Sequence, residues 1–299
     1  MLSSCWLRGS ARRLLGRGLL ATFAWPVGAC SVLVDSDRQQ CATNGDCQTR
    51  GGVFAKAICS NAVCITEPRW GCVGTVVWPT PPPVASPEKV TVKLALSNLV
   101  TSEVVSGAAA RVCGKLDPKC DTPLQVEVLS NDEGVLTVQL NKFFDGYLEI
   151  KFPGMVDTIY TFNPPVDAER VVPFVPLVPF TALEVFGKEL KMLPQPDRGT
   201  VIGLTYDCQG QSAEGIQLST DEADDLTAPF YMAAGFPSLE ATMTDKSGQG
   251  GIANVPVGAR LISGRRADTG ELIGTVSVQT RAIWITYTSM LPTPLSTQK

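Results

Sequence analysis

The sequence predicts an all-β fold, with two tandem β-sandwiches preceded by a small disulfide-rich module. Runs of alternating apolar and polar residues recur through residues 88–290, and a period of two is typical of half-buried strands. The 22 prolines and 27 glycines divide the chain into the short segments that frequent turns require. Four of the ten cysteines crowd into residues 41–64, a segment too short to build a core without covalent cross-links.

The first predicted sandwich occupies residues 88–180. Within it we expect strands at residues 89–96, 124–130, 135–140, 146–152, 157–163 and 170–178. The last of these runs carries Pro173 and Pro176 and is followed by Pro179, and proline cannot donate to a sheet ladder. We therefore expect this run to be an edge strand or irregular.

Residues 181–198 are predicted to connect the two sandwiches, and residues 181–193 are the best helix candidate in the chain. Thr181 can cap this helix, Glu184 follows at the capping-box spacing, and Pro194 ends it. The second sandwich is expected at residues 199–290 and a C-terminal tail at residues 291–299. Its predicted strands are residues 199–208, 215–220, 239–244, 259–266, 272–280 and 282–288.

The first 29 residues have the features of an export signal. Four arginines precede a short apolar run at residues 18–25, which is too short to span a bilayer. The segment Val27-Gly28-Ala29-Cys30 resembles the bacterial lipobox, in which the cysteine receives a diacylglycerol and becomes the mature N-terminus. This resemblance implies that Cys30 is a lipid anchor, and Ser31 after it favours sorting to the outer membrane. The alternative is an ordinary secretory signal with Cys30 as a disulfide partner.

Eight further cysteines follow Cys30, and an even number in an exported chain indicates four disulfides. They are Cys41, Cys47, Cys59, Cys64, Cys72, Cys113, Cys120 and Cys208. The first four allow three pairings, among which we favour one-with-three and two-with-four, although spacing does not select it. Cys113 and Cys120 bracket a turn-like hexapeptide and are expected to pair, which leaves Cys72 and Cys208 by elimination.

The cysteine-rich module is expected at residues 41–72. A tether at residues 30–40 precedes it. A proline-rich linker at residues 73–87 follows it, and such a linker is a semi-rigid spacer.

The composition excludes several classes of function. The chain has no histidine, which excludes Ser-His-Asp triads, Cys-His pairs and histidine-ligated zinc sites. Its net charge is −4, and residues 30–299 carry −8 because four basic residues and no acidic one lie before Cys30. So acidic a chain is unsuited to binding nucleic acid, which requires a basic patch. We expect no cofactor and no enzymatic activity.

One acidic loop is a candidate calcium site. Its carboxylates are Asp221, Glu222, Asp224 and Asp225, and clustered carboxylates on a loop can hold calcium together with backbone carbonyls. Their spacing fits no EF-hand, so a solvated acidic loop is the alternative interpretation.

Residues 130–150 and 244–264 are weak copies of one unit. Each opens with an Asn or Asp turn that ends in glycine, and each continues into a strand. In the second copy, "TDKSGQGGIANVPVGARLI" resembles the carboxypeptidase regulatory-like domain, whose pattern is T-D-x-x-G, an apolar strand, then V-P-x-G. The resemblance implies an Ig/transthyretin-like β-sandwich without catalytic residues. It covers residues 199–288 better than residues 88–180, where "FFDG" replaces V-P-x-G.

The whole arrangement resembles bacterial exported lipoproteins that join a cysteine-rich segment to tandem domains of this type. We therefore expect a non-catalytic, lipid-anchored envelope or cell-surface protein that acts as a structural, adhesion or ligand-binding module. Its expected partners are the membrane, through the anchor, and a protein or carbohydrate. The alternative is an accessory subunit or a carboxylate-dependent hydrolase acting on peptides or glycans.

Overall fold

The structure is a computed structural model that describes residues 40–54, 57–60, 62–65, 69–73, 86–189, 194–233 and 235–292. The signal segment, the anchor residue Cys30 and most of the proline-rich linker lie outside the described residues. The chain divides into two compact units, residues 1–66 and residues 67–299, and each is described by itself.

The cysteine-rich unit is a short helix beside a two-stranded ribbon. Its elements are α1 (Asn44–Gln48), the 3-10 turn η1 (Gly52–Phe54), β1 (Ile58–Ser60) and β2 (Val63–Ile65). Thr43 caps α1 while the Asp46 carboxylate accepts from the amide of Thr43, a reciprocal box that satisfies amides at the helix start. Two disulfides, Cys41–Cys59 and Cys47–Cys64, form the favoured one-with-three and two-with-four pattern.

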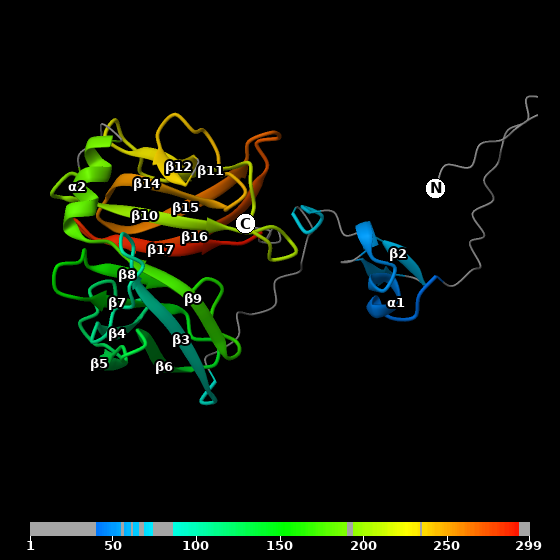
Figure 1. Ribbon diagram of the computed structural model, residues 1–299, viewed down its shortest axis with the longest axis horizontal. Coiled ribbons are helices and arrows are strands. Elements are labelled where there is room, and N and C mark those ends of the chain that lie inside the picture. The colour runs from blue at the N-terminus through cyan, green and yellow to red at the C-terminus, as the bar shows by residue number, and fades with distance from the viewer. Residues whose placement is uncertain are drawn as a thin grey trace, which may run out of the picture. The chain divides into compact units, whose positions relative to one another are not determined.

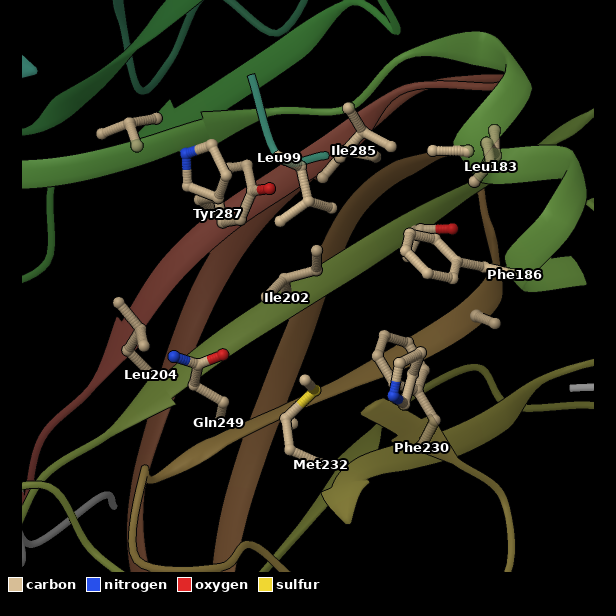
Figure 2. Close-up of a pocket in the computed structure, with 18 of the residues that line it drawn as sticks. Leu99, Leu183, Phe186, Ile202, Leu204, Phe230, Met232, Gln249, Ile285 and Tyr287 are labelled. Atoms are coloured by element: carbon tan, nitrogen blue, oxygen red, sulfur yellow. The ribbon is translucent and has the colours of Figure 1, made fainter. Parts of the chain in front are cut away.

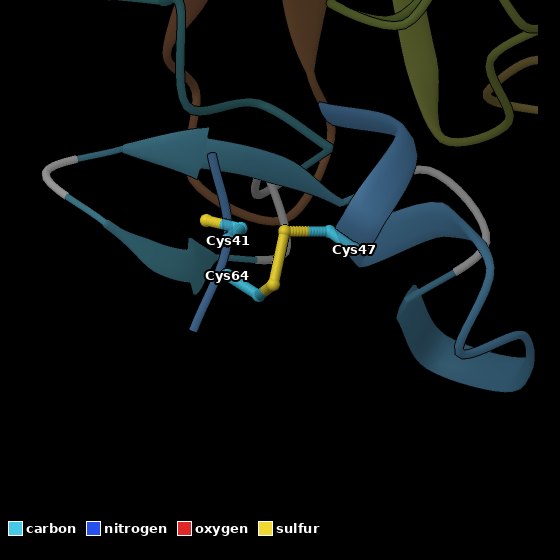
Figure 3. Close-up of side chains that lie close together, drawn as sticks. All are labelled: Cys41, Cys47 and Cys64. Carbon is cyan, nitrogen blue, oxygen red and sulfur yellow. A yellow bond between two sulfur atoms is a disulfide. The ribbon is translucent and has the colours of Figure 1, made fainter. Parts of the chain in front are cut away.

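The sulfur atoms of Cys41, Cys47 and Cys64 lie close together in this unit (Figure 3). Metal ions bind thiolates, whereas each of these sulfurs is already bonded to another sulfur. The cluster is therefore the covalent core of a unit that is too small for an apolar one.

The first sandwich consists of two facing sheets, β6-β3-β9 and β8-β7-β4-β5. Alternate side chains of β3 are buried and pack against alternate side chains of the facing β4 and β7. β9 is an edge strand, as its prolines predict, because it pairs only with β3. The strands are β3 (Lys89–Asn98), β4 (Ala109–Gly114), β5 (Gln125–Leu129), β6 (Val135–Asn141), β7 (Gly146–Lys151), β8 (Thr158–Thr161) and β9 (Arg170–Leu177).

The second sandwich faces the strands β13-β12-β14-β10-β17 against the sheet β11-β15-β16. Its buried core includes Val201, Leu218, Ile252 and Ile262. The strands are β10 (Arg198–Thr205), β11 (Ile216–Thr220), β12 (Ala228–Ala233), β13 (Phe236–Ser238), β14 (Gln249–Pro256), β15 (Gly258–Arg266), β16 (Leu272–Thr280) and β17 (Ile285–Met290).

The two sandwiches repeat one topology. β3 pairs antiparallel with β6 and parallel with β9, and β10 pairs in the same senses with β14 and β17. In the facing sheets β7 pairs antiparallel with β4 and β8, as β15 does with β11 and β16. The sequence repeat is therefore a structural one, and its two turns end in Gly134 and Gly248 with φ values of 72° and 69°.

A single parallel pairing joins the sandwiches. β8 of the first pairs with β17 of the second, which produces one nine-stranded sheet, β13-β12-β14-β10-β17-β8-β7-β4-β5 (Figure 1). On β17, Ile285 and Tyr287 pack in the apolar core of the first sandwich, whereas Met290 packs in that of the second. Because successive side chains of a strand point to opposite faces, the two three-stranded sheets cover opposite faces of the nine-stranded sheet.

The connector is the helix α2 (Phe180–Glu189), which lies beside the second sandwich in Figure 1. It begins one residue earlier than expected, so Thr181 lies in its first turn and does not cap it. Residues 190–193, where the helix was expected to end, lie outside the described residues. Among the described residues, neither helix is long and apolar enough to cross a bilayer.

The strand expected at residues 239–244 is wrong. That segment is irregular, and its apolar residues Leu239 and Met243 are exposed and do not lie on a buried strand face. Thr244 is buried, and its hydroxyl donates to the carbonyl of Ala213 and accepts from the amide of Ile216. The strands β4, β12 and β13 were not expected. Pro229 and Pro237 lie inside β12 and β13 and hid them, although both strands are near the sheet edge, where proline is tolerated.

Each sandwich carries one disulfide. Cys113–Cys120 closes the loop that follows β4, and Cys72–Cys208 fastens residues 69–73 to the second sandwich. Trp70 then packs on the core of that sandwich, and Arg69 pairs with the buried Asp207 at 3.0 Å. These are the two remaining pairings that we expected.

Candidate functional site

A cavity of about 660 Å³ lies on the outer face of the second sandwich, the face of β12-β14-β10-β17 that points away from β11-β15-β16. This volume falls within the roughly 300–1,000 Å³ typical of small-molecule sites. The helix α2, strand β9 and the turn after β3 form its other walls. It therefore lies where the two sandwiches and their connector meet.

Strand alternation supplies the floor of the cavity. On β10, Val201 points into the core of the second sandwich while Ile202 and Leu204 point the other way, into the cavity. Phe230 and Met232 of β12 extend the floor (Figure 2). The facing sheet β11-β15-β16 covers only one face of β10. Because β10 is apolar on both faces, its other face requires a separate cover.

The helix α2 supplies that cover. Leu183 and Phe186 are three residues apart and thus share one helix face, and Figure 2 shows both turned toward the cavity. Val175 and Val178 add to the same wall from β9 and the residue after it. The wall is therefore built from the end of the first sandwich and from the connector.

Gly251 of β14 leaves room for the Phe230 ring to lie against the β14 backbone. A Cβ added at this glycine would come within 2.3 Å of the ring and 2.6 Å of the Val201 carbonyl. Any larger residue at position 251 would push the Phe230 ring into the cavity. The glycine thus maintains the space above it.

The described walls carry no Asp, Glu, Lys or Arg. Their polar groups include the amide of Gln249, which faces the cavity in Figure 2, and the phenols of Tyr160 and Tyr287. Burial raises the pKa of Tyr160 to about 12 and also raises that of Tyr287. Both phenols are therefore neutral at physiological pH, and both residues belong to the lining of the cavity.

The Tyr287 hydroxyl is, with that of Thr288, one of two buried side-chain hydroxyls of the cavity lining that have no hydrogen-bond partner among the described residues. Tyr287 itself is 6% exposed. Buried hydroxyls are normally paired, because an unpaired one loses its bonds to water without replacement.

The mouth of the cavity has an apolar rim. Val100, Phe174, Val185 and Phe236 line the cavity yet are 63%, 52%, 54% and 71% exposed. Single exposed apolar residues are ordinary, whereas a group of them around a concave site is typical of a binding surface.

The acidic loop that was a candidate calcium site is engaged with arginines. Asp224 pairs with Arg198 at 2.7 Å, and this contact lowers the pKa of Asp224 to about 2. Glu222 pairs with Arg260 at 3.0 Å, and the Asp221 carboxylate accepts from the amide of Leu261. Asp225 is exposed. Among the described residues, these four carboxylates do not converge within metal-binding distance of one another.

A second polar cluster lies in the first sandwich. Glu149 is buried between Arg111 and Arg281 and contacts both. Its carboxylate lies near Cys113 and Cys120 in a metal-like grouping, but these sulfurs form a disulfide. Glu149 and the two arginines therefore form structural ion pairs. They lie on the face of the nine-stranded sheet that points away from β6-β3-β9.

The cavity was not expected from the sequence. A signal was present, because β10 carries Ile202 and Leu204 at positions where the equivalent strand β3 carries Lys93 and Ala95. Cys30, the expected lipid anchor, lies outside the described residues, so its role stays a prediction.

Comparison with known proteins gives no family. No family model and no curated protein matches the chain. Among solved structures, similarity is found to the Bacillus anthracis TIE protein, with 10% identity over 69% of this chain and a TM-score of 0.25. The chain covers 34% of the length of that protein.

Two pilins are also similar. The major pilin subunit BcpA of Bacillus cereus is 10% identical over 66% of this chain and 69% of that one, with a TM-score of 0.25. The shaft pilin spaA from Lactobacillus rhamnosus GG is 13% identical over 70% of this chain and 100% of that one, with a TM-score of 0.21. At such scores no function is transferred from these proteins.

Proposed function

We propose that this protein is an exported, non-catalytic binding module whose site is the cavity between α2 and the outer face of the second sandwich. The observation that carries the proposal is the cavity itself, with its apolar floor, unpaired Tyr287 hydroxyl and exposed apolar rim. Together they form a concave apolar site with few polar groups, which is the usual composition of a small-molecule site.

Export and anchoring complete the proposal. The four disulfides fit an oxidising compartment outside the cytosol. Acylation of Cys30 would hold the module at the membrane, since two or more buried acyl chains anchor a protein stably. The carboxypeptidase regulatory-like family remains part of this proposal, supported by the paired glycine turns of the two sandwiches. Mass spectrometry of the mature N-terminus tests the anchor: an unmodified Cys30 thiol would contradict it.

Titration with N-phenyl-1-naphthylamine, an uncharged dye that fluoresces in apolar surroundings, tests the binding site. We expect saturable fluorescence with one dye per chain. Ala253→Trp places an indole inside the cavity and should abolish the signal, because Ala253 is part of its wall.

Ala259→Trp is the matched control, since Ala259 is an exposed strand alanine that does not line the cavity. Equal dye binding by both variants would remove the cavity as the site. Circular dichroism of each variant confirms that it is folded.

A further inference from the structure

We propose that the cavity takes one uncharged, lipid-like molecule: an alkyl or acyl chain that carries a single neutral oxygen group, such as an alcohol or an ester. The Tyr287 phenol donates its hydrogen bond to that oxygen. This inference rests on the proposed function and specifies the ligand of the same site.

The walls select against charge. None of the described lining residues is ionised at neutral pH, so a bound carboxylate, phosphate or ammonium would lie in an apolar space without an opposite charge. Burying an unpaired charge is far more costly than burying a neutral group of equal size. A neutral molecule avoids that cost.

The walls also select against a molecule with many polar groups. Most of the floor and the helix wall is aliphatic or aromatic carbon, and Tyr287 and Gln249 lie on the β17 and β14 parts of the floor. A sugar would leave most of its hydroxyls unpaired against such walls. A hydrocarbon chain with one oxygen group matches the walls, because its chain meets carbon and its oxygen meets the phenol.

Tyr287 fixes where that oxygen lies. Its residue is 6% exposed, and its hydroxyl has no partner within the described residues. The equivalent edge strand of the first sandwich, β9, has no tyrosine, so the phenol is not a requirement of the shared fold. An ester carbonyl or alcohol that accepts from this O–H supplies the missing bond.

The test is displacement of N-phenyl-1-naphthylamine from the full chain by four ten-carbon compounds: 1-decanol, methyl decanoate, decanoate and decyltrimethylammonium. All are used below their micelle concentrations. We expect both neutral compounds to bind at least about tenfold more tightly than either ion, since each tenfold corresponds to about one unpaired polar group.

Tyr287→Phe tests the hydrogen bond. It should weaken methyl decanoate about threefold to tenfold, the range of one hydrogen bond, relative to the affinity of the same variant for the dye. Tyr206→Phe is the matched control, because Tyr206 lies outside the cavity, and it should alter neither affinity.

The outcomes separate the two proposals. If the dye itself fails to bind, the proposed function is wrong. If the dye binds but the ions displace it as well as the neutral compounds do, or Tyr287→Phe has no effect on methyl decanoate, only the ligand class is overturned.

Discussion

The outer faces of the two sandwiches differ although the strands behind them have one topology. On β3 of the first sandwich, Lys89, Thr91 and Lys93 point outward and are exposed or partly exposed. On the equivalent β10, Ile202 and Leu204 point outward and line the cavity. The shared fold therefore does not require an apolar outer face, and the second sandwich has acquired one.

The sheet to which β12 belongs explains part of this difference. Strand β12 follows the acidic loop at residues 221–225. In the first sandwich the corresponding strand, β5, pairs with β4 in the facing sheet. In the second, β12 pairs with β14 on the other sheet, and β13 extends it. This change of sheet widens the outer face by two strands and brings Phe230 and Met232 into the floor of the cavity.

The sandwiches should differ most in how much their disulfides, Cys72–Cys208 and Cys113–Cys120, contribute to the free energy of unfolding. Replacing Cys72 and Cys208 by serine opens a loop with a sequence separation of 136, whereas Cys113 and Cys120 are separated by 7. Chain entropy then predicts losses of about 5 and about 2 kcal/mol in the free energy of unfolding. Urea unfolding of the two double variants measures both, and equal losses would show that chain entropy does not set the stability of the second sandwich.

Tyr160 tests the seam where the sandwiches join. Its pKa is raised from 10.0 to about 12 by burial, so its contribution to stability is complete below pH 10 and is lost as the pH rises to about 12. The loss should reach about 2 to 3 kcal/mol. Urea unfolding from pH 9 to 12 measures it against Tyr160→Phe, whose curve should be flatter; parallel curves would contradict the assignment.

Exchanging one residue between the outer faces should have unequal effects. Ile202→Lys gives β10 a residue type that β3 carries, and it should cost about 2 kcal/mol and abolish dye binding, because the charge enters an apolar wall. Lys93→Ile is the reverse change on an exposed face, and it should stay within about 0.5 kcal/mol. A cost for Lys93→Ile as large as that for Ile202→Lys would make the two faces equivalent.

The smallest effect is expected at the loops that precede β5 and β12. The first is closed by the Cys113–Cys120 disulfide and the second by the pairs Asp224–Arg198 and Glu222–Arg260. Because these carboxylates are already engaged, calcium should give no heat in calorimetry and no change in melting temperature. Binding heat that Asp224→Asn removes would restore the calcium site.

Much of the fold followed from the sequence, because alternation along strands such as residues 89–96 has a direct physical cause in burial on one face. The four disulfide pairings agreed with expectation: Cys113 and Cys120 bracket a short turn, Cys72 and Cys208 remained by elimination, and the pattern of the first four was favoured although spacing did not select it. The repeated Asx-glycine turn at Gly134 and Gly248 marked equivalent points of both sandwiches.

The cavity could not be predicted from the sequence, because strand alternation carries no information about what covers each face. Alternation only assigns residues to two faces, so Ile202 and Leu204 resembled ordinary core residues. The floor also depends on β12, whose Pro229 argues against a strand, and on a parallel pairing between β8 and β17 that are more than a hundred residues apart. Such long-range pairing leaves no local pattern.

A crystal structure of the full chain with 10-bromo-1-decanol tests the central claim most directly, because anomalous scattering locates bromine without interpretation of weak density. We expect one bromine peak between α2 and the floor formed by β12, β14 and β10, with the alcohol oxygen at the Tyr287 hydroxyl. Peaks on the exposed face of β3 alone, or a cavity that stays free of bromine at saturating ligand, would contradict the account.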